Sequence, residues 1–316
     1  MTRPVMVWGV PTESPVELLL GALARHGADP VVVHPRQFLE QSVDIGLSGG
    51  ELRGSIRVGD RTTDVGDIGG VYVRPIEPEL VPELKGMAAD DPPMRRARAE
   101  FDALMAFTEA APDALGCRVA SRLSAMASNM SKPYPAQLVQ KGGFDTPETV
   151  VTDDPDEARA FVDAHQGAIY KSVSGVRSIV SVVDLDRDAD RLGLIRWCPV
   201  QFQEHVRGRD VRVHVVGDEV YAAIVDSSAT DYRYARAQVG EDATLAPYAL
   251  ADDVAERCVG LARDLDLPFA GVDLKLADDG RIVCFEVNPS PGYSWYEMAA
   301  GLPISDALAR WLMRAA

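Results

Sequence analysis

The sequence predicts a mixed α/β (α+β) fold of more than one domain. The chain has 316 residues, of which 47% are hydrophobic and 25% are charged, as in ordinary globular proteins. Strand-like and helix-like segments alternate along the first third, and two hairpin patterns flanked by helices occupy the last third. This composition excludes fibrous, collagen-like and largely disordered chains.

The N-terminal unit, predicted to span 1–118, starts as a strand–helix–strand segment. Ser14 as the cap, Pro15 at the first helical position and Gly27 after the last turn mark the ends of its first helix. The predicted elements are a strand Pro4–Val10, a helix to Arg25, a strand Val31–Val33, short strands within 43–74, and a helix from Pro92 to about Ala111.

The rest of the chain is predicted to form two further units, 119–197 and 198–316. The first has helices at 132–141 and Pro155–Gln166, strands at Glu148–Thr152, Ala168–Lys171 and Ile179–Val183, and a Ser/Gly-rich loop at 172–178. The second has hairpins Asp210–Val216/Glu219–Asp226 and Phe269–Leu276/Arg281–Val287, with helices at about 251–264 and 296–314.

The last hairpin places two carboxylates opposite each other. Asp279-Gly280 between two alternating runs is typical of a two-residue type I′ turn. With that turn, Asp273 lies opposite Glu286, and the alternation of side chains puts Lys275 and Asn288 on the same face. The residues expected to point into the core are Val272, Leu274, Val283, Phe285 and Val287.

Facing carboxylates repel each other, so the pair destabilises the sheet unless a cation lies between them. Oxygen ligands from Asp273, Glu286 and Asn288 suit Mg²⁺, which also takes oxygens from phosphate groups. The alternative is a solvated outer face with unrelated charges, because surface strands often carry Asp and Glu. The hairpin alone leaves both interpretations open.

Further motifs follow one another in a set order. Only five of the 32 basic residues are lysines; of these, Lys132 begins a helix and Lys171 ends an apolar strand. The later segments are the loop 172–178, Gln201–Val206, Arg209–Gly217, Asp273 and Glu286–Asn288. In this order they resemble the ATP-grasp superfamily over about residues 120–316, and the N-terminal unit resembles its pre-ATP-grasp domain. The resemblance implies that ATP binds between two α+β subdomains.

The resemblance also implies a nucleotide site. Two lysines would act as point charges on the phosphates, and the Ser/Gly-rich loop would close over them with its backbone N–H groups. The residues around 204–206 would read the adenine edge, and an aspartate would hold the ribose hydroxyls. The nucleotide-binding residues so implied are Lys132, Lys171, Ser174, Gly175, Glu204, His205, Val206 and Asp210. Surface lysines and an ordinary hairpin turn are the alternatives.

The catalytic and metal-binding residues are implied in the same way. Arg212 shares a strand face with Asp210 and would reach the γ-phosphate and an acyl-phosphate, with Lys171 as the second catalytic residue. Mg²⁺ would be held by Asp273, Glu286 and Asn288. ATP and Mg²⁺ are therefore the expected cofactors.

Within the superfamily the sequence resembles both the RimK-like ligases and the graspetide (microviridin-type) peptide maturases. Asn288–Gly292 resembles the RimK-type ending, whereas Asp231–Arg233 and Trp295–Glu297 resemble maturase segments. Val71–Pro75 resembles the aromatic-Arg-Pro element of maturases, without its second arginine. Arg74 and Arg233 are the candidates for holding carboxylates of the acceptor, and exposed arginines without such a role are the alternative.

The favoured function is an ATP-dependent, ADP-forming ligase that joins a carboxylate to an amine of an amino acid or peptide. The alternative is a graspetide synthetase, which forms side-chain esters or amides in a ribosomally made precursor peptide. A small-molecule kinase on the same fold would leave no new amide. A non-catalytic nucleotide-binding module would not need the charges that act on the γ-phosphate.

The formal net charge of −16 argues against a nucleic-acid partner, because phosphate binding needs basic surface. No apolar run is long enough to span a bilayer, and the N-terminus lacks the order of a signal peptide. We therefore expect a cytoplasmic protein, with four reduced cysteines and no membrane partner. A homodimer is an expectation from the frequency of symmetric dimers alone.

Overall fold

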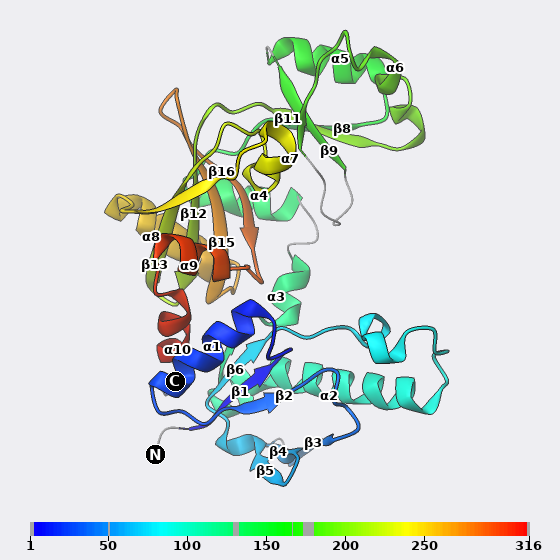
Figure 1. Cartoon of the computed structure of the whole chain (residues 1–316), viewed down its shortest axis with the longest axis vertical. Helices are drawn as coiled ribbons and strands as arrows, with labels where there is room; N and C mark the ends of the chain where they lie inside the picture. Colours follow the sequence, from blue (N-terminus) through cyan, green and yellow to red (C-terminus); the bar gives the residue numbers. More distant parts are fainter. Residues whose placement is uncertain (1–2, 50, 129–132, 166, 173–179, 315–316) are drawn as a thin grey trace.

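The computed structural model describes residues 3–49, 51–128, 133–165, 167–172 and 180–314. Figure 1 shows three parts along the longest axis: an N-terminal part, a five-stranded sheet beyond it, and a smaller four-stranded sheet at the far end. In the part of the chain described, no helix is both long and apolar enough to cross a membrane.

The N-terminal part contains β1 (Val5–Trp8), α1 (Ser14–Arg25), β2 (Val31–Val33), β3 (Gln41–Ser48), β4 (Glu51–Val58), β5 (Arg61–Asp64), β6 (Gly70–Val73), α2 (Pro92–Leu115) and β7 (Arg118–Ala120). Its parallel sheet has the order β2-β1-β6-β7, and β3-β4-β5 form a separate antiparallel sheet. Successive side chains of β1 point to opposite faces of the sheet, and both faces are covered: Val5 and Val7 pack with α1, and Met6 and Trp8 pack with α2. The predicted strand–helix–strand start is confirmed.

Two helix ends differ from the prediction. Glu13, not Ser14, is the N-cap of α1, and Ser14 is its first residue. The second helix, α2, passes the predicted end at Ala111 and closes at Gly116, whose φ of 58° lies in the left-handed region that glycine adopts without strain.

After β7, α3 (Leu123–Ser128) and α4 (Pro133–Lys141) lead along the five-stranded sheet, where Ala125 and Val139 pack in the core that it forms with the helix Asp252–Asp264. The far part contains β8 (Thr149–Thr152), α5 (Pro155–Ala164), β9 (Ala168–Ser172), β10 (Ser181–Val182), α6 (Ala189–Leu192) and β11 (Val200–Glu204). Its four strands form an antiparallel sheet of order β10-β9-β11-β8. Phe202 and Tyr170 pack against Ala158 and Val162 of α5 on one face. Alternation along β9 and β11 therefore puts Lys171 and its neighbours on the other face.

The five-stranded sheet contains β12 (Gly208–Val216), β13 (Glu219–Asp226), α7 (Ala235–Val239), β14 (Thr244–Tyr248), α8 (Asp252–Asp264), β15 (Phe269–Ala277) and β16 (Ile282–Asn288). Its order is β14-β13-β12-β15-β16, antiparallel throughout. Val211 and Val213 pack with Cys258 and Leu261 of α8, so this helix covers one face of the sheet. On the opposite face, Val216 and Phe269 at one end pack in the core shared with α1 and the helix Ile304–Met313, and polar side chains line the strands beyond them.

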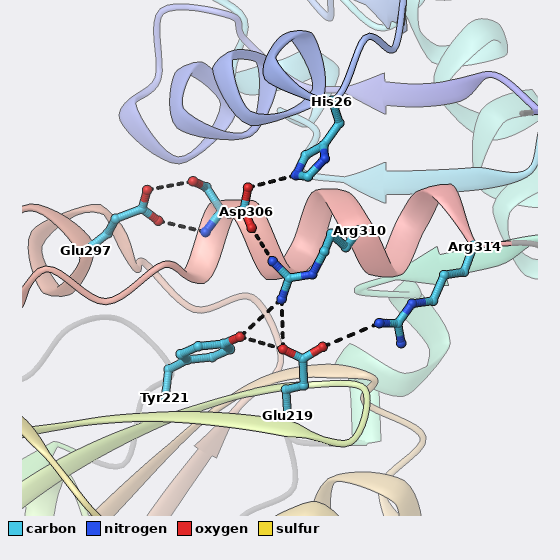
Figure 2. A network of polar contacts seen from close by, with 8 residues as sticks. His26, Glu219, Tyr221, Glu297, Asp306, Arg310 and Arg314 are labelled. Atoms are coloured by element: carbon cyan, nitrogen blue, oxygen red, sulfur yellow. Dashed lines mark hydrogen bonds and ion pairs between the residues drawn. The ribbon is translucent and has the colours of Figure 1, made fainter.

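The predicted single helix over 296–314 is wrong, because it is two helices, α9 (Ser294–Ala300) and α10 (Ile304–Met313). Gly301 (φ 66°) ends the first, and Pro303 precedes the second. Figure 2 shows how α10 joins the N-terminal part to the sheet: Asp306 accepts from His26 at 2.7 Å, and Arg310 pairs with Glu219 at 2.8 Å.

The hairpin β15–β16 keeps the predicted carboxylate pair with a different turn. The connection has three residues, closed by a hydrogen bond from Ala277 N–H to the Arg281 carbonyl, so the predicted two-residue turn is wrong. The extra turn residue offsets the strand pairing by one residue near the turn. A β-bulge between Asp273 and Leu274 cancels this offset, so Asp273 lies opposite Glu286 as predicted.

The same bulge corrects one core assignment. Cys284, not Phe285, is buried in the core, and the ring of Phe285 is half-buried with the Lys275 ammonium 5.8 Å from its centroid. An extra residue in one strand changes the face of every side chain between the bulge and the turn.

Candidate functional site

The polar face of the five-stranded sheet brings together five of the predicted site residues, Asp210, Arg212, Asp273, Glu286 and Asn288. Arg212 on β12 is paired with Asp273 on β15, and Asp273 is paired with Glu286 on β16. These three residues form one row across the sheet. A second row places Asn288 two residues along β16, opposite Gly271.

Arg212 is held inside this face. Its Nη1 donates to Asp273 Oδ1 at 2.7 Å, its guanidinium lies 5.7 Å from the ring centroid of Tyr296, and only 5% of the residue is exposed. Burial alone would lower the pKa of Arg212, but the charge of Asp273 and the nearby tyrosines raise it above its ordinary value. The side chain is therefore a fixed positive charge.

Gly271 makes room for that arginine. A Cβ at this position would lie 2.1 Å from Arg212 Nη2, closer than any real contact allows. The guanidinium thus occupies the space over the glycine, in the row next to its own. His214, opposite Gly271 on β12, is fully buried, and burial beside Arg212 holds its pKa well below the ordinary value.

Asp210 and Lys275 form the next pair along the two strands. Lys275 Nζ lies 3.2 Å from Asp210 Oδ1, and both side chains are largely buried. Burial raises the pKa of Asp210, although Lys275 opposes the shift. An aspartate already paired with Lys275 would have to share its oxygens with a ribose.

The carboxylates and the amide present the donor set that Mg²⁺ prefers. Glu286 is exposed, Asp273 lies opposite it, and Asn288 Oδ1 accepts from Ser290 N–H at 3.0 Å. The described residues contain no group of three or more His, Cys, Asp or Glu side chains arranged for a metal. Two carboxylates and an amide therefore fit an ion that takes its remaining ligands from phosphate and water.

Arg74 reaches this edge of the sheet from the N-terminal part. Its Nε donates to Glu13 Oε1 at 2.7 Å, and its Nη1 donates to Ser290 Oγ at 3.2 Å. The backbone N–H of Ser290 in turn donates to Asn288 Oδ1. One hydrogen-bonded chain thus links the predicted acceptor-binding arginine to a predicted metal ligand.

Of the predicted nucleotide-binding residues, Lys171 lies on β9, Glu204 lies on β11, and His205 and Val206 follow that strand. Lys171 Nζ donates to Gln203 Oε1 at 3.4 Å, on the face away from α5. Glu204 ends β11, and its carboxylate is bound by Arg281, which lowers its pKa. Burial lowers the pKa of His205, and the backbone at Val206 leads into β12.

Four predicted residues cannot be placed in this site. Lys132, Ser174 and Gly175 lie outside the described residues, and the side chain of Arg233 lies outside them as well. Their roles stay predictions.

The sequence analysis missed the aromatic cover of Arg212. Tyr296 is buried and Tyr232 is half-buried beside Arg212, and their hydroxyls are 3.0 Å apart. The available signal was the position of Tyr232 next to Arg233 and of Tyr296 within Trp295–Glu297. Glu13 was also missed, because a loop glutamate with no periodic pattern gives no sign of its partner.

Comparison with known proteins gives a family match and several relatives. Residues 129–312 match the model of the RimK-like ATP-grasp domain. The chain is 31% identical over 199 residues to the ribosomal protein bS6–L-glutamate ligase of Shigella flexneri serotype 5b, which covers 60% of this chain and 65% of that protein. A probable alpha-L-glutamate ligase of Citrobacter koseri is 32% identical over 187 residues, covering 56% and 61%. The matched region thus spans less than two thirds of these curated relatives.

Solved structures match almost the whole chain. The ATP-grasp ligase PsnB, solved with a phosphomimetic variant of a minimal precursor, Mg and ADP, is 26% identical with a TM-score of 0.77, over 99% of this chain and 98% of that one. The macrocyclase MdnC from Microcystis aeruginosa MRC, bound with the precursor peptide MdnA, is 20% identical with a TM-score of 0.75, over 98% of both chains. These similarities confirm the predicted ATP-grasp fold.

Proposed function

The chain belongs to the RimK-like ATP-grasp family, and from this premise we propose that it is an ATP-dependent, ADP-forming ligase that joins a carboxylate to an amine, with a peptide as a substrate. One observation carries the proposal: the buried Arg212 is fixed by Asp273, and Asp273 lies directly opposite the exposed Glu286. A fixed cation beside two carboxylates suits phosphoryl transfer from a Mg²⁺-bound nucleotide.

The proposed reaction has two steps. The carboxylate oxygen of the substrate attacks the γ-phosphorus of ATP, the bond to ADP breaks, and an acyl-phosphate forms. The amine then attacks the acyl carbon, phosphate leaves, and the amine loses a proton. Arg212 would stabilise the negative charge on the transferred group, and Lys132 and Lys171 would hold the phosphates. Mg²⁺, when held by Asp273, Glu286 and Asn288, supplies charge neutralisation between the phosphate oxygens.

The rest of the chemistry is positioning. Correct orientation of two reactants can remove about 7–11 kcal/mol from a barrier. In the proposal, the predicted unit 1–118 presents Arg74 to the acceptor, 119–197 carries the phosphate-binding residues, and 198–316 carries the metal ligands and Arg212. The adenine and ribose would meet Glu204 to Asp210, where β11 runs into β12.

A peptide substrate is supported by the full-length match to PsnB, whose structure holds a precursor. A second candidate follows from the same observation: ester or amide crosslinks formed within one precursor peptide. Addition of free glutamate to a protein is supported instead by the bS6–L-glutamate ligase, over a shorter stretch of the chain. Product mass distinguishes them, since a crosslink loses one water from the peptide and a ligation adds one residue.

Nucleotide binding is the first test. A ligand at about 100 times its Kd adds about 2.7 kcal/mol of stability, so Mg-ADP and Mg-AMPPNP should raise the melting temperature while NAD should not. EDTA should remove the shift, and Glu286→Ala should abolish turnover measured as ADP release. Absence of a shift with every adenine nucleotide, or wild-type turnover in Glu286→Ala at modest Mg²⁺, would contradict the proposal.

A further inference from the structure

A hollow with aromatic walls opens beside Arg212, between α7 and α9. Its volume is about 480 Å³, and its walls include Tyr232, Tyr234, Trp295 and Tyr296. Ala237 and Ala243 lie on the wall formed by the 235–243 segment, where their small side chains leave the space open. Cavities of this size are in the range that proteins use to bind small ligands or single side chains.

The aromatic walls are organised before any ligand binds. Trp295 is stacked on Tyr232 with ring centroids 6.3 Å apart at 25°, and it lies 5.3 Å from Tyr296. Trp295 is nevertheless 39% exposed, so part of a large apolar ring faces the solvent. Covering that ring with another apolar side chain is favourable, and fixed rings lose little conformational entropy when they bind.

The hollow borders the predicted reaction site. Tyr296 is a wall residue of the hollow. Its ring also contacts Arg212, whose guanidinium lies 5.7 Å from the ring centroid. The hydroxyl of Tyr232, also a wall residue, is 3.0 Å from that of Tyr296. A group in the hollow is therefore separated from Arg212 by a single layer of side chains.

The charges around the hollow are paired with one another. Arg212 lies behind one wall, and Arg236 lies on another, 3.4 Å from Asp242 in a pair exposed to solvent. Exposed pairs of this kind contribute little and rearrange readily. Because Arg212 is paired with Asp273 and Arg236 with Asp242, the described walls of the hollow offer no free charge to a ligand, and its aromatic and alanine walls suit an apolar aromatic or large aliphatic group.

We propose that this hollow binds an aromatic or large aliphatic side chain of the peptide substrate, next to the residue whose carboxylate is activated. The inference rests on the proposed function, because it takes the acceptor to be a peptide bound at Arg212. It adds a specificity site: the hollow selects the neighbour of the reacting residue, and Arg212 acts on the reacting group itself.

The test uses the full chain with Mg-ATP and short peptides in which one Glu is flanked by Phe, Leu, Ala or Lys. We expect kcat/KM, measured as ADP release, to be about tenfold or more higher with Phe or Leu than with Ala, and lowest with Lys. Trp295→Ala and the hollow-filling Ala237→Phe should bring the Phe/Ala ratio close to one. Met298→Ala, at an exposed apolar residue of α9 that does not line the hollow, is the matched control and should keep the ratio.

Equal use of Phe and Ala peptides by the wild type, or a ratio unchanged in both hollow variants, overturns the inference and leaves the ligase proposal intact. Absence of turnover with every peptide counts against the ligase proposal on these substrates. The inference is then decided by binding of the same peptides, measured by isothermal titration calorimetry: tighter binding of the Phe peptide that Trp295→Ala removes supports it, and equal binding overturns it.

Discussion

In the five-stranded sheet the charged side chains are held by strand register, whereas in the N-terminal part they are held by loops and a single helix. Arg212, Asp273 and Glu286 stand in one row fixed by two strand pairings. Arg74, by contrast, follows β6 and is oriented by Glu13 and Ser290, which come from two different loops.

The two regions therefore hold their charged side chains with different rigidity, which suits them to different roles. A charge fixed by register needs no rearrangement at the moment of reaction, which is what stabilisation of a transition state requires. A charge fixed by loops from two parts of the chain adjusts more readily and suits binding of the acceptor. We therefore expect substitutions in the sheet to act on kcat and those around Arg74 to act on KM.

The largest effect is expected for Arg212→Ala. Loss of a fixed charge at the transition state typically lowers kcat by about 10²–10³-fold, or roughly 3–4 kcal/mol. The Kd of Mg-ATP, measured by titration, should change far less. Equal losses in kcat and in nucleotide affinity would make Arg212 a ground-state clamp and remove the contrast with Arg74.

Gly271→Ala should have the next largest effect, because the new Cβ would lie 2.1 Å from Arg212 Nη2 and displace the guanidinium. Overpacking of this kind costs about 1–3 kcal/mol of stability, and we expect kcat to fall about 10- to 100-fold. Kinetics and thermal unfolding measure the two effects separately.

Gly260→Ala is the control for that substitution, since a Cβ there, on α8, meets nothing within 4 Å. Alanine should raise helix stability by about 0.5–1 kcal/mol and leave kcat unchanged. Wild-type kcat in Gly271→Ala would show that Arg212 does not depend on the strand below it.

In the N-terminal part, Glu13→Gln keeps a hydrogen-bond acceptor for Arg74 but removes the charge that orients it. A charge-assisted hydrogen bond contributes about 1.5–3 kcal/mol, so the KM of the acceptor should rise about tenfold while kcat changes less. Acceptor saturation curves at fixed Mg-ATP measure this. A fall in kcat with unchanged KM would assign Arg74 to the reaction step instead.

The same contrast explains how far the sequence could predict the site. The pairing of Asp273 with Glu286 followed from strand alternation, and it survived a wrong turn because a bulge compensated for the extra loop residue. The break between α9 and α10 was missed although Gly301 and Pro303 signal it. Contacts between distant loops, such as that of Arg74 with Glu13, leave no periodic pattern, so they could not be predicted.

The smallest effect concerns a buried carboxyl of the N-terminal part that lacks the cation found in the sheet. Glu100 on α2 is 7% exposed and accepts a hydrogen bond from Gln41, and among the described residues its Oε2 has no partner. Burial raises the pKa of Glu100 to about 7, despite opposition from Gln41 and Arg96. The folded state therefore binds this proton more tightly than the unfolded state, so its contribution to stability is present below about pH 4.5 and is lost as the pH rises through 7.

Glu100→Gln removes this titration, so its melting temperature relative to wild type should rise by about 2–4 °C between pH 5 and 8. Thermal unfolding at several pH values measures the difference. Asp102→Asn, at an exposed carboxylate on the same helix, is the control and should show no such trend. A flat difference for Glu100→Gln would mean that this carboxyl is charged in the folded protein, and that the N-terminal part pairs its buried charges as the sheet does.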